Sequence, residues 1–244
     1  MKFPALAAAA LLSAAPALAA GAPAAAPTKK WKDSAQASFV NANGNSKATT
    51  TSAKDDFSYA FDALTSVGLE AGALGSRSLG QVTAEQYYAQ EKLQRKWDER
   101  DYVFENYRWD KNRFEKLAAR HAFSVGAGRE LWKTPKNEWV GELGPGYVIE
   151  DRIGELQRTY ASARAYTKFV HDFSATARFS QDADFQQSLK DSRDNLLRTE
   201  TALTTTLTSI FSLKTSFDWK HVGQPPPGAV KDDTLTSVAL IANF

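Results

Sequence analysis

The sequence contains no cysteine, a single methionine and only three histidines among its 244 residues. Without cysteine there is no disulfide framework, no thiolate metal site and no cysteine nucleophile. Positive and negative charges nearly balance at a formal net charge of +2, so nothing favours nucleic acid as a partner. Beyond the N-terminus no stretch holds about 18 uncharged apolar residues, and the sequence therefore predicts no membrane-spanning helix.

The N-terminus has the pattern of an export signal. Met1-Lys2 forms a short positive segment, residues 3–16 are rich in Ala and Leu, and Ala17-Leu18-Ala19 fits the small-x-small cleavage rule. We expect residues 1–19 to be a signal peptide that is cleaved near Ala19. Residues 20–30, rich in Ala and Pro, are expected to form a flexible linker, which leaves residues 31–244 as the folded domain.

The remaining chain alternates apolar and polar residues with period two, the period of a β-strand. In one example an apolar face is separated from a polar one: Phe211, Leu213, Thr215, Phe217 and Trp219 against Ser212, Lys214, Ser216, Asp218 and Lys220. Such segments reach the 9–11 residues that a tilted transmembrane strand needs. They predict an all-β protein, an antiparallel up-and-down transmembrane β-barrel of about twelve strands.

The expected strands are separated by connections of unequal length. We expect tight turns at Thr167-Lys168-Phe169 and Leu207-Thr208-Ser209, and longer polar links over residues 183–194 and 223–232. Alternation of short periplasmic turns with longer outer loops is typical of outer-membrane barrels. The segment 83–97 also suits a helix by composition. The expected strands cover residues 31–41, 46–60, 63–77, 83–97, 101–110, 116–130, 138–150, 155–167, 169–182, 194–207, 209–222 and 233–244.

Aromatic residues and the C-terminus support a membrane location. Tryptophans fall near the strand ends, as in the two aromatic girdles of a membrane barrel: Trp31, Trp97, Trp132 and Trp139 at the periplasmic end, Trp109 and Trp219 at the outer end. Phe244 closes the chain in phase with Val238 and Leu240, which resembles the C-terminal signal that the barrel-assembly machinery recognises. The match is partial, because Ala242 stands where that signal often has an aromatic residue.

The polar phase carries many charges, which should point into the lumen if the apolar phase faces lipid, since an Arg or Lys facing lipid costs about 2–4 kcal/mol near the midplane. Two roles stay open for them: salt bridges that close the barrel, or the lining of a narrow pore. Twelve strands lie between the filled eight-strand barrel and the open sixteen-strand porin. The lumen candidates are Arg120, Glu142, Glu150, Arg164, Arg178, Arg198, Glu200, Lys214 and Asp218.

The sequence also resembles a known family over nearly the whole domain, through an opening strand, an aromatic-charged segment, a GPGY element, an R-x-E-T-A-L strand and a proline-rich C-terminal loop. These are residues 31–45, 102–114, 142–147, 198–203 and Pro225-Pro226-Pro227-Gly228 followed by Asp233-Thr234. The family is the domain-of-unknown-function family of salt-induced outer-membrane proteins. The resemblance implies a barrel in the bacterial outer membrane and no reaction. Residues 61–88 fit it least.

We find no pattern that predicts catalysis or a bound cofactor. His121, His171 and His221 lack metal-ligand spacing, and no serine stands two residues after any of them, as a barrel phospholipase would need. We expect a barrel that is not an enzyme, has outer-membrane lipid and the assembly machinery as partners, and serves an envelope-structural or stress role or a narrow channel. A soluble periplasmic barrel with an oily interior and an outer-membrane hydrolase stay as alternatives.

Overall fold

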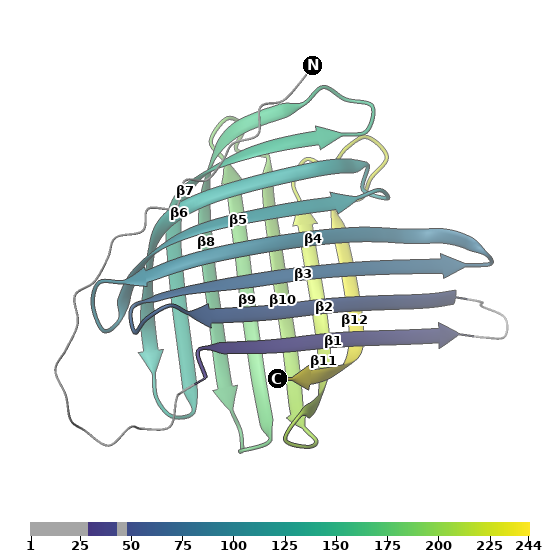
Figure 1. Cartoon of the computed structure of the whole chain (residues 1–244). Helices are drawn as coiled ribbons and strands as arrows, with labels where there is room; N and C mark the ends of the chain where they lie inside the picture. Colours follow the sequence, from purple (N-terminus) through teal and green to yellow (C-terminus); the bar gives the residue numbers. More distant parts are fainter. Residues whose placement is uncertain (1–28, 43–47) are drawn as a thin grey trace, which may run out of the picture.

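The computed structural model describes residues 29–42 and 48–244, which form twelve strands closed into one barrel (Figure 1). Within this part no helix is long and apolar enough to cross a membrane. The expected signal peptide, the linker as far as residue 28 and the Gly44-Asn45 turn lie outside the described residues. The strands are β1 Trp31–Ala42, β2 Ala48–Ala60, β3 Thr65–Ser78, β4 Gln81–Lys96, β5 Asp101–Asn112, β6 Leu117–Lys133, β7 Asn137–Arg152, β8 Arg158–Asp172, β9 Ala177–Ser188, β10 Asn195–Thr206, β11 Phe211–Val222 and β12 Asp232–Asn243.

The barrel closes between its first and last strands. β1 pairs antiparallel with β12, from Ser34 opposite Asn243 to Ala37 opposite Leu240, and the amide of Phe244 donates to the carbonyl of Asp33 at 2.9 Å. Figure 1 accordingly shows the C-terminus beside β1. This pairing closes the ring of strands, and neighbouring strands in a closed ring supply one another with the backbone hydrogen bonds that a bilayer core cannot supply.

The two ends of the barrel differ in their connections. Both ends of the strand series, Trp31 and Asn243, lie at the end that also carries turns 61–64, 97–100, 134–136, 173–176 and 207–210, which we call the terminal end. The opposite loop end carries connections 79–80, 113–116, 153–157, 189–194 and 223–231. In outer-membrane barrels the terminal end faces the periplasm.

The side-chain alternation predicted from the sequence is confirmed. On β11, Ser212 and Ser216 point inward and are each 5 % exposed, whereas Phe217 points outward and is 46 % exposed. Charged and hydroxyl side chains fill the interior, and Leu, Phe, Val and Tyr cover most of the exterior. This is the reverse of a soluble barrel with an oily cavity.

One predicted turn is wrong. β8 continues through Thr167 and Phe169 to Asp172, and the turn lies at residues 173–176. There the hydroxyl of Ser174 accepts from the amides of Thr176 and Ala177 at 3.2 and 3.1 Å, a local bond that favours a turn. Even-numbered residues point inward on both β8 and β9, so the predicted facing of the two strands is correct although the predicted turn is not.

Other predicted boundaries shift less. The segment 83–97 is a strand, β4, and its helical alternative is wrong. β9 extends to Ser188, which shortens the expected long link to residues 189–194. The loop end also has one tight turn, Leu79-Gly80, in which both residues have positive φ (50° and 81°), as two-residue hairpins prefer.

The GPGY element marks a close approach of β6 and β7. A Cβ on Gly144 would lie 2.0 Å from the carbonyl oxygen of Val125, and one on Gly126 would lie 2.2 Å from that of Leu143. A side chain at either position would force the two strands apart. The glycines therefore let the two paired strands approach each other closely in the wall beside the charged lumen.

Candidate functional site in the lumen

The candidate site is the set of charged side chains that point into the barrel, and Glu142 on β7 lies at the centre of one group. Its side chain is fully buried and accepts from the Tyr102 hydroxyl at 2.7 Å and from Arg164 Nη1 at 3.1 Å. Lys92 Nζ also binds it, from β4. Arg164 in turn holds Asp184 on β9 with Nε and Nη2 at 2.9–3.1 Å. A buried carboxylate is stable only with such partners.

A second group lies toward the loop end, around Glu150. Its carboxylate accepts from Arg120 Nε at 2.7 Å and from Arg152, and all three side chains are at most 5 % exposed. Arg158, on the next strand, pairs with Asp194 in the 189–194 loop. The group ties the wall of β6–β8 to a neighbouring loop.

The ion pair between Arg198 and Asp110 crosses the lumen. Arg198 Nη2 on β10 lies 2.7 Å from Asp110 Oδ2 on β5, although the two strands are five places apart in the ring of twelve. Asp110 also accepts from Arg108 Nε at 2.9 Å, and the Arg108 guanidinium lies 4.4 Å from the centre of the Tyr88 ring. At this level nearly opposite walls are joined by one Arg and one Asp side chain, so the lumen is constricted.

Between this constriction and the terminal end, carboxylates outnumber their partners on one wall. Asp182 and Asp218 stand directly opposite Glu200 in register on its two sides. Lys214 Nζ binds both oxygens of Glu200 at 2.7 and 2.8 Å. In the described part of the chain neither Asp182 nor Asp218 has an ion-pair partner within 4 Å. Lys168 faces Asp182 in register, and the Ser216 hydroxyl donates to Asp218 at 3.2 Å. Since neither contact is an ion pair within 4 Å, water would have to complete the solvation of these two carboxylates.

The structure places the other predicted residues as follows. Of the lumen candidates, only Arg178 lies outside the lumen, paired with Asp172 at 2.7 Å beside turn 173–176, with a side chain 60 % exposed. Val238 and Leu240 point outward, each about half exposed, and their role in assembly stays a prediction. The tryptophans occupy the expected ends: Trp31, Trp97, Trp132 and Trp139 at the terminal end, Trp109 and Trp219 toward the loop end.

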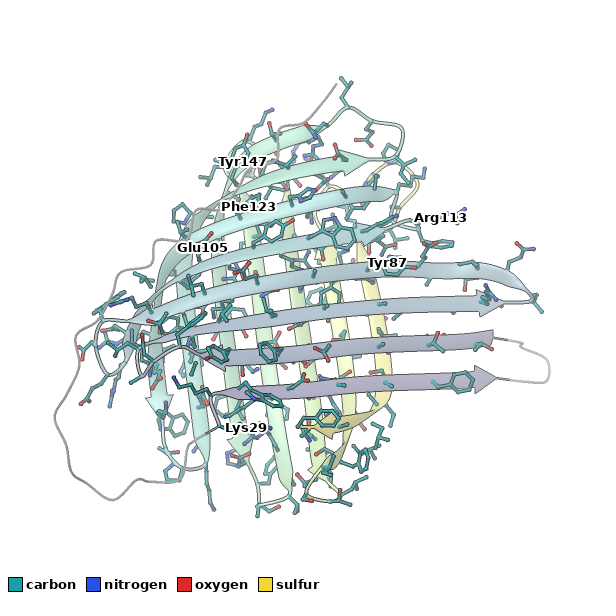
Figure 2. All side chains as sticks on the ribbon, viewed as in Figure 1. Lys29, Tyr87, Glu105, Arg113, Phe123 and Tyr147 are labelled. Atoms are coloured by element: carbon teal, nitrogen blue, oxygen red, sulfur yellow. The ribbon has the colours of Figure 1, made fainter. Side chains whose placement is uncertain are left out.

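The sequence prediction missed three outward-facing carboxylates, Asp55, Glu91 and Glu105, on β2, β4 and β5. All three are exposed, and Figure 2 shows Glu105 on the same outer surface as Phe123 and Tyr147. Asp55 and Glu91 line a shallow hollow of that surface. Because β2 and β4 carry charges at adjacent positions, such as Asp55-Asp56 and Glu91-Lys92, charge alone did not reveal the facing of these strands.

The histidines are dispersed. His121 Nδ1 lies 2.9 Å from the Tyr107 hydroxyl, His171 Nδ1 lies 2.7 Å from Asn137 Oδ1, and His221 Nδ1 lies 2.7 Å from Asp232 Oδ1. Across residues 29–42 and 48–244, no three His, Cys, Asp or Glu side chains come together in a way that could hold a metal ion. The charged side chains that line the lumen can attract and orient charged or polar groups.

Comparison with known proteins gives a family and a fold. The family model described as "Protein of unknown function, DUF481" matches residues 35–244. The uncharacterized protein YdiY of Escherichia coli (strain K12) is 23 % identical over 213 residues, which cover 87 % of this chain and 82 % of YdiY. Neither description gives a function.

Solved outer-membrane barrels share the fold at low identity. The COG4313 outer membrane channel from Pseudomonas putida F1 superposes with a TM-score of 0.52 at 12 % identity, over 90 % of this chain and 97 % of that one. The NanC porin gives a TM-score of 0.51 at 10 % identity, over 87 % and 97 %. At these identities the likeness establishes the barrel architecture and nothing further.

Proposed function

The chain belongs to the DUF481 family of proteins of unknown function, and from that premise we propose that it is a narrow outer-membrane channel for small polar solutes. The observation that carries the proposal is the pair of inward carboxylates, Asp182 and Asp218, that have no ion-pair partner within 4 Å among the described residues. Leaving a charge without a partner in a dry interior costs several kcal/mol. Their presence below the constriction is therefore best explained by a lumen that holds water.

The constriction sets the size of what could pass. A lumen spanned by the Arg198–Asp110 pair excludes large solutes, and it exposes permeating ones to charges of both signs. Charged constrictions of this kind select by charge as well as by diameter. A solute small enough to move beside one Arg side chain, and polar enough to replace water around Asp182 and Asp218, fits this lumen.

Planar-bilayer recording of the refolded barrel tests the proposal. We expect small conductance steps for the wild type and larger steps for Arg198→Ala and for the double variant Arg198→Ala/Asp110→Ala, which removes both charges of the crossing pair. Arg178→Ala is the matched control, because it removes an arginine that lies outside the lumen, and its conductance should equal that of the wild type.

An envelope-structural barrel is the second candidate, and the dense ion pairs around Glu142 and Glu150 favour it. If it holds, neither the wild type nor the Arg198→Ala/Asp110→Ala variant will conduct. Folding must be verified independently, by the faster migration of unheated barrel on detergent gels. Folded protein without conductance in both forms would overturn the channel proposal in favour of a sealed barrel.

A further inference from the structure

The loop between β11 and β12, residues 223–231, reaches the opposite side of the barrel mouth. Lys116 Nζ, in the β5–β6 turn, donates to the carbonyl of Pro227. Since β5 and β11 lie six places apart in the ring of twelve strands, this bond joins opposite walls. In Figure 1 the β11–β12 loop lies near the β5–β6 turn at the loop end.

The same loop is held at two further points around the mouth. Arg152 Nη2, at the end of β7, donates to the carbonyl of Gln224 at 2.8 Å. The Gln224 side-chain amide donates to Asp191 Oδ2, in the 189–194 loop, at 2.9 Å. The loop is thus tied to three other elements of the rim, and it covers the mouth from β11–β12 toward β5–β7.

Directly beneath the loop, two ion pairs also join opposite walls of the barrel. Lys220 on β11 pairs with Glu115 in the β5–β6 turn, and one level deeper Arg198 pairs with Asp110. The loop therefore lies over the constriction, and a solute that enters from the loop end must pass it first. In the described part of the chain, the turns at the terminal end are three or four residues long.

The loop has a closed base and a stiff interior. Its base is closed by the amide of Val222 donating to the carbonyl of Lys231 at 2.8 Å. Within it, Pro225-Pro226-Pro227 is a stiff run, and the amide of Ala229 donates to the carbonyl of Pro226 at 3.0 Å. Gly228 adopts a φ of +85°, which turns the chain after the prolines. The Gly223 amide anchors the base of the loop to the carbonyl of Asn195 at 2.8 Å. Three side-chain contacts, from Lys116, from Arg152 and to Asp191, hold the rest of the loop.

We propose that the 223–231 loop is the gate of the channel: closed when bound to Lys116, Arg152 and Asp191, and open when those contacts release. This inference rests on the proposed channel function and adds its regulation. Loss of one hydrogen bond from a charged donor shifts such a two-state equilibrium by about tenfold. Lys116→Met should therefore raise the open-to-closed ratio in single-channel records about tenfold.

A matched control and a covalent lock make the test specific. Lys190→Met removes an exposed lysine from a neighbouring loop at the same end, and it should leave the open-to-closed ratio unchanged. Because the chain has no cysteine, Lys116→Cys/Pro227→Cys can be joined by a short disulfide-forming thiol crosslinker. The crosslinked barrel should lose conductance, and dithiothreitol should restore it, while either single-cysteine variant should not respond.

The outcomes separate the gate from the channel. A crosslinked barrel that conducts like the uncrosslinked one overturns the gate and leaves the channel standing. The decisive further variant replaces residues 224–230 with a short Gly-Ser link. If this variant folds and is silent, along with the wild type and Lys116→Met, both the gate and the channel proposal fail.

Discussion

At the scale of single residues, the three outward carboxylates are the least expected feature of the molecule. Glu105 is two outward positions beyond Asp101, the terminal-end residue of β5. With a rise of about 3.4 Å per residue and a tilt of about 40°, it stands about 10 Å into the barrel wall, near the middle of a 25 Å apolar band. A carboxylate at that depth opposes membrane insertion.

Glu105→Leu is therefore expected to stabilise the barrel in lipid. Because the variant removes a charge from the apolar band, the free energy of unfolding from vesicles should rise by about 1–2 kcal/mol. Glu99→Leu is the control, since Glu99 lies in the exposed turn 97–100, and it should change stability by less than about 0.5 kcal/mol. A loss of stability in Glu105→Leu would show that the carboxylate has a partner in the membrane.

Asp191 makes a second residue-scale prediction, about pH. Hydrogen bonds from the Arg193 guanidinium and amide, and from Gln224, hold the pKa of the Asp191 carboxyl below its ordinary value. A carboxyl with a lowered pKa keeps its stabilising contacts above about pH 4 and loses them only as the pH falls through that lowered pKa. The contact with Gln224 should thus persist from pH 7 to pH 5.

The gate should accordingly respond to Asp191→Asn and not to mild acid. We expect the variant to show a higher open-to-closed ratio than the wild type, by the same factor at pH 7 and pH 5 in bilayer records. If the wild type instead approaches the variant between these two pH values, then Asp191 is not held ionised as the geometry indicates.

At the scale of the strand, facing is the property that the sequence predicted best. Phe217 points outward and Asp218 inward beside Glu200, its register partner. Phe217→Arg should sharply reduce the yield of folded barrel in vesicles, because its charge must enter lipid at a cost of about 2–4 kcal/mol. Asp218→Arg should assemble normally, since Glu200 and water can receive the new charge. Equal yields would contradict the facing of β11.

Asp218 is used as the control position in preference to Ser216, the preceding inward residue of β11, because Ser216 is too tightly packed. Ser216 is buried, and its hydroxyl lies 2.9 Å from that of Ser237 and 3.2 Å from Asp218 Oδ2. A large side chain at Ser216 would test packing as much as charge. Asp218 has more room and has the Glu200 carboxylate beside it. A substitution there therefore tests only whether an inward-facing charge is tolerated.

Strand ends were less accessible to sequence reasoning than strand faces. Alternation continues unbroken through Thr167, where a turn was predicted, because β8 runs on to Asp172. The four-residue turn 173–176 then preserves the same phase in β9. The true turn at 173–176 is marked by the local bonds of Ser174, a weak signal within a run of Phe, Ser, Ala and Thr. β4 was predicted as a strand despite its many helix-favouring residues, and closure of the sheet overrides that local preference.

At the scale of the whole molecule, the lumen contacts could not be predicted. The sequence identified Arg198 and other inward charges, but the Arg198–Asp110 pair joins residues 88 positions apart on nearly opposite walls. Which walls meet depends on the curvature and stagger of the closed barrel, which period-two alternation does not encode. The loop contacts of Lys116 and Arg152 depend on the same geometry, so the proline-rich segment was expected only as a long connection.

In the proposed channel, apolar side chains face hydrocarbon and charges face an aqueous lumen. Since the chain lacks cysteine, a spin label can be attached singly at each position of β11, residues 211–222, in the barrel reconstituted in vesicles. We predict that oxygen, which concentrates in lipid, collides more often with labels at odd positions, whereas a water-soluble nickel complex is favoured at even ones. Collision rates without alternation, or with the opposite phase, would contradict the account.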